Sequence, residues 1–408
     1  MELKDILINN FSAQEASDFQ KENFEEFKKL GFPTIKNEEW KYTSLSEATK
    51  QNYKIATIDK AESVSTLEID GLDAYKLYFV NGLFDENISS KNIKGLVISL
   101  NYQPDTEIFG QYKRYNKDGL ISLNNSYSRN GILIEIAKNT ILDKPIVLYY
   151  INNTKSENSL ALPHVSILAN ENTQAKFVEI FSKQGENTAF TNAITEVVLQ
   201  ENAHIEYYKF ANEGENSFHV GTTQVNQLGK SVFHGVTVGL KGDVVRNNMN
   251  ILMAKPYSES HIFGLTFLNN DSHIDNHTVV DHAEHNCESN ELYKSVLDGN
   301  STSVFNGKIF VRQDAQKTNA YQSSKNILLS NTASAYSKPQ LEIWADDVKC
   351  SHGHATGQLN NDQIFYLRAR GIGEQEAKKM LTKAFAKDIL EKITIEPLKI
   401  YLEKLVEN

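Results

Sequence analysis

The sequence is poor in cysteine, since its 408 residues include only Cys287 and Cys350. Two cysteines cannot build a disulfide framework, so both are expected as free thiols, available as metal ligands, nucleophiles or core residues. Nowhere do about eighteen apolar residues follow one another, which excludes a membrane-spanning helix. The N-terminus also lacks the apolar core of a secretion signal. We therefore expect a cytoplasmic protein that has no membrane partner.

Basic residues are in deficit, with 42 Lys and Arg against 52 Asp and Glu and a net charge of -10. Nucleic-acid binding depends on neutralising phosphates with basic side chains, so no nucleic-acid partner is expected. Hydrophobic residues make up 40% and charged residues 23% of the chain, which indicates a folded globular protein. The length allows two or three domains.

Catalytic motifs are missing as well. The sequence has no G-x-S-x-G, and neither cysteine belongs to a nucleophile motif. Gly229, Lys230 and Ser231 resemble the end of a phosphate-binding loop, but Gln224 stands where that loop needs its first glycine. A strand is expected after these residues, which leaves no helix N-terminus for phosphate. We expect that the chain is not an ATPase and not an enzyme.

What the sequence does contain is a long series of short strands. Between about residues 131 and 355, alternating runs such as Ile132–Ile136 and Ile146–Tyr150 are separated by turns rich in Asn and Gly. This sequence pattern predicts a mainly β protein. Strands begin roughly every 30 residues, a period typical of a solenoid, at Asn172, Asn202, Lys230, Glu259, Asn300 and Asn331. A parallel β-helix fits this pattern best, and a large β-sandwich is the alternative.

Both ends of the sequence carry helical patterns. The first sixty or so residues read as helical, with apolar residues such as Phe27 on one face before Gly31 stops the run. A mixed segment and the strands follow, and helices are then expected from Asn360, over residues 374–390 and from Pro397. The expected domains are an N-terminal helical or mixed domain at 1–125, a parallel β-helix core at 126–355 and a C-terminal helical domain at 356–408.

Residues 346–354 contain several side chains that can bind metals. If it is extended, Cys350, His352 and His354 project from the same side, because successive side chains of a strand alternate. A thiolate and two neutral imidazoles suit iron or zinc. The same spacing also suits a polar strand edge, so a metal-related or interface role and a solvated edge are both open.

A second group concentrates histidines between residues 273 and 287. It consists of His273, Asp275, His277, Asp281, His282, His285 and Cys287. The spacing is not that of a zinc site. Polar side chains in a solenoid commonly form ladders between coils and satisfy one another by hydrogen bonds, so we expect a structural role.

Five stretches carry specific motifs. They are NEEWKYT at 37–43, SVFNGKI at 303–309, AQKTNAYQ at 315–322, KPQLEIWADDVKCSHG at 338–353 and QIFYLRARGI at 363–372. Together they resemble the SufD branch of the SufB/SufD family of iron-sulfur cluster assembly proteins. The Cys-Ser-His-Gly run is the SufD version of its strand, whereas His354 and Ala355 stand where relatives usually carry Ala and Thr.

The resemblance implies a right-handed parallel β-helix and a non-catalytic scaffold subunit that supports iron acquisition and cluster assembly. It implies pairing with SufB through the C-terminal edge of the β-helix and docking of the SufC ATPase on the C-terminal helical domain. It also allows a homodimer of the isolated chain. His352 falls where the family places a histidine at the SufB interface, with Cys350 and His354 beside it. The C-terminal signature contains the expected SufC contacts, namely Phe365, Tyr366, Leu367, Arg368 and Arg370.

Two cysteines cannot supply the four protein ligands that an iron-sulfur cluster normally takes. We therefore expect no cofactor bound tightly by this chain alone, and an iron-sulfur cluster or iron that is shared transiently with SufB. The alternatives are a β-helical carbohydrate-active enzyme, which would need a constellation of carboxylates on its surface, and a purely structural solenoid.

Overall fold

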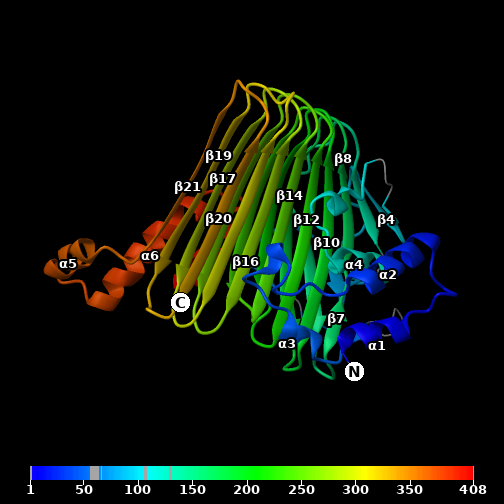
Figure 1. The fold of residues 1–408 in the computed structure, drawn as a ribbon, viewed down its shortest axis with the longest axis horizontal. Coiled ribbons are helices and arrows are strands. Elements are labelled where there is room, and N and C mark those ends of the chain that lie inside the picture. Colours follow the sequence, from blue (N-terminus) through cyan, green and yellow to red (C-terminus); the bar gives the residue numbers. More distant parts are fainter. Residues whose placement is uncertain (1, 56–63, 66, 105–107, 128–130, 408) are drawn as a thin grey trace.

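The computed structural model describes residues 2–55, 64–65, 67–104, 108–127 and 131–407. Its centre is a β-solenoid in which two sheets face each other and the chain alternates between them (Figure 1). Neighbouring strands in each sheet run parallel, except in the pairs β2–β3 and β4–β5. The predicted parallel solenoid is confirmed, and the β-sandwich alternative is wrong.

The strands of both sheets follow the solenoid axis in order. Sheet A contains β20 (Ser334–Ile343), β18 (Thr302–Val311), β16 (His273–His282), β14 (Val244–Met253), β12 (Ser217–Gln227), β10 (Ala189–Leu199), β8 (His164–Ala169), β5 (Ile132–Ile136) and β4 (Leu96–Leu100), with β7 (Ser159–Ala161) beside β10 and β1 (Lys54–Ile55) beside β7. Sheet B contains β21 (Lys349–Gly357), β19 (Asn319–Leu328), β17 (Glu288–Leu297), β15 (Glu259–Leu268), β13 (Val232–Lys241), β11 (His204–Asn212), β9 (Gln174–Gln184), β6 (Ile146–Asn153), β2 (Tyr75–Val80) and β3 (Leu83–Asp85).

Left-handed backbone explains several of the asparagines at the turns. Asn139, Asn172 and Asn202 have φ values of 59°, 57° and 56°. Asparagine adopts this conformation more readily than most residues with a Cβ. The three side chains also connect coils, because Asn172 Nδ2 donates to Asn139 Oδ1 at 2.8 Å and Asn202 Nδ2 donates to Asn172 Oδ1 at 3.0 Å.

The turn at Asn172 provides a test of this explanation. We expect Asn172→Ala to lower the free energy of unfolding by about 1–2 kcal/mol, because a Cβ without a local polar group is strained in left-handed backbone. Asn172→Gly keeps the backbone conformation and loses only the side-chain bonds, so its loss should be smaller. Urea unfolding of both variants measures the difference, and equal losses would contradict the conformational part of the explanation.

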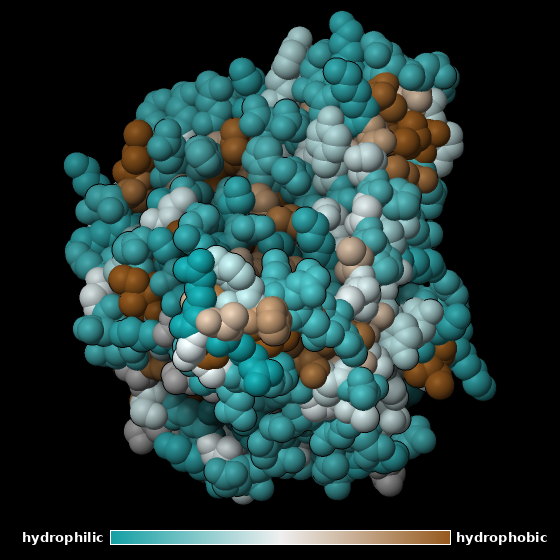
Figure 2. Space-filling model, turned by 90° about the vertical axis from the view of Figure 1, so that its left-hand side faces the viewer, coloured by the Kyte–Doolittle hydropathy of each residue, from teal (hydrophilic) through white to brown (hydrophobic). Residues whose placement is uncertain are grey.

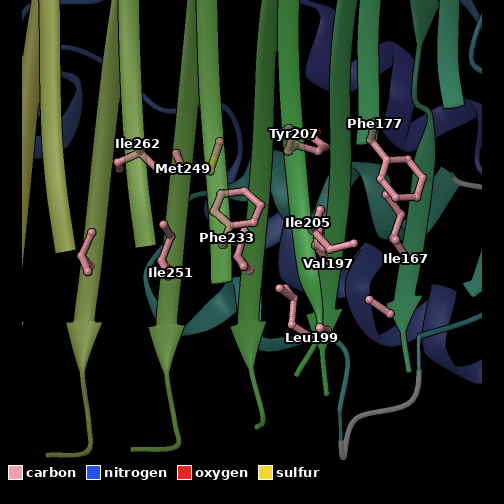
Figure 3. Close-up of a cluster of buried hydrophobic side chains, with 14 of the residues drawn as sticks. Ile167, Phe177, Val197, Leu199, Ile205, Tyr207, Phe233, Met249, Ile251 and Ile262 are labelled. Carbon is pink, nitrogen blue, oxygen red and sulfur yellow. The ribbon is translucent and has the colours of Figure 1, made fainter. Parts of the chain in front are cut away.

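The main core lies between the two sheets. Inward side chains from both sheets interlock there, and their exposed fractions are close to zero (Figure 3). Figure 3 labels ten of them, namely Ile167, Phe177, Val197, Leu199, Ile205, Tyr207, Phe233, Met249, Ile251 and Ile262. Burial of this apolar area is the dominant favourable term in folding.

The N-terminal region covers the outer face of sheet A. Its helical elements are α1 (Leu3–Asn10), α2 (Asp18–Leu30), the 3₁₀ helices at Glu38–Trp40 and Gln111–Arg114, α3 (Ser46–Thr49) and α4 (Gly119–Tyr127). Phe27, Trp40 and Leu123 pack there with Phe190 and Phe218 of the sheet. This packing fixes residues from the first fifty positions against the middle of the solenoid.

The prediction of helix over the first sixty or so residues is correct for α1 and α2 but not for the whole segment. Residues 54–55 form strand β1, and residues 56–60 lie outside the described part of the chain. The strand-like runs after this segment also join the solenoid, since β2 pairs with β6 and β4 with β5. The sheets therefore begin inside the segment 1–125.

The C-terminal helices cover the opposite side, the outer face of sheet B. They are α5 (Asn361–Ala369), α6 (Glu374–Leu390) and α7 (Glu396–Glu407). Ile389, Leu398 and Leu402 pack against Tyr208 and Phe263 of the sheet. In contrast, α5 projects away from the solenoid next to its last coil (Figure 1).

Candidate subunit-interface site at the open end of the solenoid

The last coil leaves one edge of each sheet open. Within the described residues, β20 pairs with β18 and β21 with β19, and neither strand has a second neighbour. Residues 351–357 of β21 are exposed. An open edge presents backbone N–H and C=O groups to which another chain can add. The open end is therefore a candidate interface between subunits.

Strand β21 places the three predicted site residues on one side. In its parallel register with β19, Cys350 pairs with Ala320, His352 with Gln322 and His354 with Ser324. The β19 residues at these positions are buried in the solenoid. The side chains of Cys350, His352 and His354 thus lie over the open end of the core, as the alternation predicts. The role of this set remains a prediction.

The two cysteines lie in different environments. Cys350 is half-buried and packs against the core, and burial raises the pKa of its thiol. Cys287 is buried at a turn, and burial raises its pKa to about 11. Both are therefore thiols at neutral pH, whereas metal binding requires the thiolate. Among the described residues, no group of three or more His, Cys, Asp and Glu side chains is arranged to hold a metal ion.

Large apolar side chains are exposed on the last coils. Tyr321, Tyr336, Ile343 and Trp344 are between 39% and 51% exposed. Trp344 stacks on Phe310, with their ring centroids 6.3 Å apart. Figure 2 views the molecule from this end and shows apolar patches among hydrophilic residues. Aromatic residues are enriched in protein interfaces. Sequence patterns did not indicate these residues, because alternation assigns a side chain to one face of a strand and does not show which outward-facing side chains other elements cover.

Helix α5 holds the residues expected to contact SufC. Phe365 is 74% and Tyr366 is 57% exposed. Arg368 and Arg370 are exposed as well, and Leu367 is partly exposed. The Arg370 guanidinium lies over the Tyr366 ring at 4.7 Å. The helix therefore presents aromatic and cationic groups together, and their role remains a prediction.

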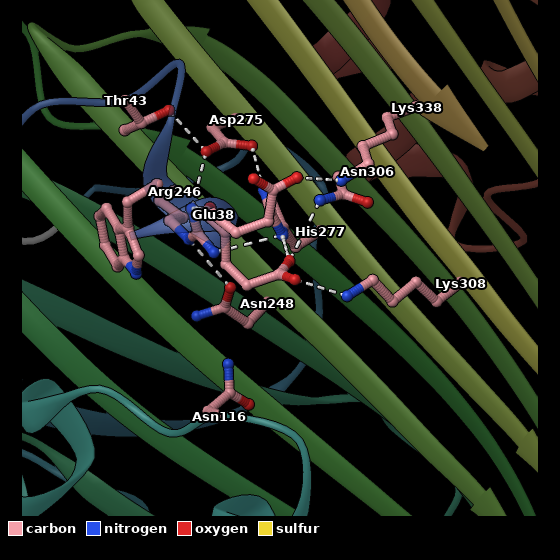
Figure 4. Close-up of polar contacts among 12 residues, drawn as sticks. Glu38, Thr43, Asn116, Arg246, Asn248, Asp275, His277, Asn306, Lys308 and Lys338 are labelled. Carbon is pink, nitrogen blue, oxygen red and sulfur yellow. Dashed lines mark hydrogen bonds and ion pairs between the residues drawn. The ribbon is translucent and has the colours of Figure 1, made fainter. Parts of the chain in front are cut away.

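Three members of the histidine group at 273–287, namely His273, Asp275 and His277, contact the N-terminal segment. Figure 4 shows Asp275 and His277 beside Thr43 and Glu38 of that segment. Thr43 Oγ1 donates to Asp275 Oδ2 at 2.6 Å and lies 2.9 Å from His273 Nε2. His277 Nε2 lies 3.0 Å from Asp275 Oδ1. We call residues 38–43 the N-terminal clamp.

The clamp spans several coils. Glu38 pairs with Lys338 of β20 at 2.6 Å, and Glu39 pairs with Lys308 of β18 at 2.5 Å. The His277 hydrogen bond and then Lys308 lower the pKa of Glu39 to about 2, against the opposing effect of burial. Burial alone would raise the pKa of Asp275, but His277 and Arg246 hold it below its usual value. The clamp therefore depends on ionised carboxylates.

This geometry fits the structural role expected for the histidine group. Its members, however, bond not only side chains on adjacent coils but also residues of the N-terminal segment. Arg246 and Asp275 do pair between adjacent coils, whereas Thr43 and Asp275 are 232 positions apart. His282 faces the interior, where Nε2 lies 2.8 Å from Ser289 Oγ. Sequence patterns could not show that residues 38–43 supply the partners. The only available signal was the specific motif at 37–43.

Comparisons with known proteins agree with this architecture. Residues 150–385 match the family described as SUF system FeS cluster assembly, SufBD core domain, and residues 2–148 match the SufBD protein N-terminal region. The iron-sulfur cluster assembly protein SufD of Escherichia coli is 30% identical over 93% of this chain and 89% of its own length. A SufBD family protein of Synechocystis is 29% identical over 92% and 87%, and SufD of Bacillus subtilis is 24% identical over 90% and 87%.

Proposed function

Because the chain belongs to the SufBD family of iron-sulfur cluster assembly proteins, we propose that it is a non-catalytic scaffold subunit that pairs with SufB through the open end of its solenoid. The observation that carries this proposal is the arrangement of β20 and β21. Their unpaired edges lie beside His352 and His354 and beside exposed aromatic residues. A partner strand that adds to either edge would bring its own side chains next to these imidazoles.

The incomplete ligand set supports a shared site. His352 and His354 offer nitrogen ligands, and Cys350 offers one sulfur ligand, whose pKa is raised by burial. An iron-sulfur cluster takes four ligands, mostly thiolates. The missing thiolates would come from SufB, and iron or a cluster would be the cargo at the joint site. His352 is the proposed ligand of this chain.

Helix α5 supports the second part of the proposal, docking of the SufC ATPase. An exposed helix with Phe365, Tyr366 and two arginines has the composition of an interface hot spot. Its position beside the last coil would put SufC close to the SufB interface. ATP-driven movement of SufC could then be transmitted to the joint site.

The shared site can be tested by anaerobic reconstitution of the complex of this chain with SufB and SufC, using Fe(II) and sulfide. We expect His352→Ala to lower cluster yield, read by absorbance, by about tenfold or more, because the joint site loses one of its ligands. His204→Ala, at the start of β11 and far from the open end along the sheet, is the matched control. An unchanged yield in an intact complex would remove His352 from the site.

SufC docking can be tested separately by affinity measurement. We expect the double variant Phe365→Ala, Tyr366→Ala to weaken SufC binding by about 2 kcal/mol or more, because exposed aromatic residues in hot spots have effects of this size. SufB binding should not change. Ile400→Ala, on α7 and 41% exposed, controls for the loss of an exposed apolar side chain. Equal SufC binding by the double variant and wild type would refute docking through α5.

A further inference from the structure

A row of polar side chains runs through the interior of the last three coils of sheet B. The register pairs Glu291 of β17 with Gln322 of β19, and Gln322 with His352 of β21. Glu291 is 0% and Gln322 is 3% exposed. Adjacent strands lie about 4.8 Å apart, and partners in a parallel register project from the same face. The row therefore leads from the core to the imidazole at the open end.

The inner end of the row is satisfied by hydrogen bonds. Thr278 Oγ1 donates to Glu291 Oε2 at 2.6 Å, and Gln322 Nε2 donates to Glu291 Oε1 at 3.2 Å. These contacts fix which way the Gln322 amide points, since its NH₂ group faces the carboxyl group of Glu291. The amide oxygen is left for another donor.

Among the residues that the structure describes, none donates a hydrogen bond to that oxygen. Within the described residues, Gln322 Oε1 is buried and makes no hydrogen bond. A buried acceptor without a partner is unfavourable, and a donor from a neighbouring side chain would remove that cost. The next side chain along the row belongs to His352, which carries a ring N–H that can be donated.

The opposite sheet makes room for this amide. A Cβ at Gly307 of β18 would lie 2.3 Å from Gln322 Nε2 and 2.8 Å from its Cδ. Any side chain at position 307 would therefore displace Gln322. Glycine at position 307 leaves space for the Gln322 amide, and the hydrogen bond to Glu291 orients this amide next to the open end.

We propose that Gln322 is a positioning residue for His352, whose ring N–H it accepts at Oε1 so that the other ring nitrogen faces the open end as a metal ligand. This inference rests on the proposed function of His352. Histidines that bind metals commonly donate their second ring N–H to a carbonyl or carboxylate, which selects the tautomer and the ring orientation. Thr278, Glu291 and Gln322 would together preorganise the imidazole.

The first test reads the tautomer of His352 in the full-length chain by ¹⁵N NMR of labelled histidine, with the signal assigned by its loss in His352→Ala. We expect one dominant tautomer in wild type and a mixture in Gln322→Met, which keeps the volume but has no acceptor. Gln322→Asn, whose amide is too short to reach, should behave like Gln322→Met. Asn326→Leu changes another inward amide of β19 that bonds Thr356 instead, and it should leave the tautomer unchanged.

The second test uses the reconstituted complex with Fe(II) and sulfide. We expect Gln322→Met to lower iron affinity by about 10–100-fold and Gln322→Glu, which retains an acceptor oxygen, to restore most of it. In the His352→Ala background, Gln322→Met should cause no further loss. An unchanged tautomer in both Gln322 variants, or an equal loss with and without His352, overturns the inference. A shifted tautomer together with a normal yield in His352→Ala would overturn the proposed role of His352 and leave the positioning intact.

Discussion

Arg246→Met is expected to lower the free energy of unfolding by about 3–5 kcal/mol, because it leaves the buried carboxylate of Asp275 without the guanidinium that pairs with it. Arg246 is 1% exposed and its guanidinium stacks on Trp40 at 3.9 Å. Its Nη1 donates to Asp275 Oδ2 at 3.0 Å and to the backbone oxygen of Glu39 at 2.6 Å, and its Nε donates to Asn248 at 3.1 Å. One side chain therefore joins the clamp to the solenoid.

Urea unfolding compares this variant with two others. Arg246→Met combined with Asp275→Asn should recover much of the loss, since the uncompensated charge is then removed. Lys338→Met breaks the exposed pair with Glu38 and should cost no more than about 1 kcal/mol. A loss below about 1 kcal/mol for Arg246→Met would show that the clamp does not depend on this buried pair.

Glu291→Gln is expected to stabilise the protein above pH 7. Burial is the largest influence on Glu291 and raises its pKa from 4.5 to about 7. Between about pH 4.5 and pH 7, the folded state therefore keeps the carboxyl proton of Glu291, whereas the unfolded state has lost it. The stability that Glu291 contributes is fully present below pH 4.5 and is lost as the pH rises to 7. The loss amounts to about 3 kcal/mol at 1.36 kcal/mol for each pKa unit.

The measurement is the difference in unfolding free energy between Glu291→Gln and wild type from pH 4.5 to pH 8. This difference should increase in favour of the variant by up to about 3 kcal/mol. Glutamine keeps an acceptor for Thr278 and carries no charge, so its own contribution should not change over this range. Glu288→Gln, at the exposed start of the same strand, is the matched control. A difference that stays constant with pH would mean that Glu291 is not held protonated by burial.

Sequence patterns predicted the architecture because successive coils of a solenoid have similar local sequence patterns. Alternating side chains and strands of similar length recur from coil to coil, and several turns have a left-handed asparagine, as at Asn172 and Asn202. Alternation also placed Cys350, His352 and His354 on one side of a strand. The motifs at 37–43 and 338–353 led to the family to which the chain belongs.

Sequence patterns failed where the outcome depended on contacts between distant positions. The first sixty residues were expected to be helical, but Lys54 and Ile55 pair with β7 as a strand. The histidine group was expected to form ladders, but Thr43 and Glu39 reach it from the N-terminal segment. Short polar segments have weak preferences of their own, so packing against an existing surface decides their conformation.

Local periodicity thus predicted a parallel solenoid, with a β-sandwich as the alternative, and it placed one thiol and two imidazoles on the last predicted strand. Only the folded chain shows that β20 and β21 have open edges and that residues 38–43 bind the N-terminal region to several coils. It also brings Glu291 and Gln322 into line with His352. The reason is physical: alternation specifies which face a side chain occupies, whereas its neighbours there come from other coils, and their register is set by the packing of the complete core.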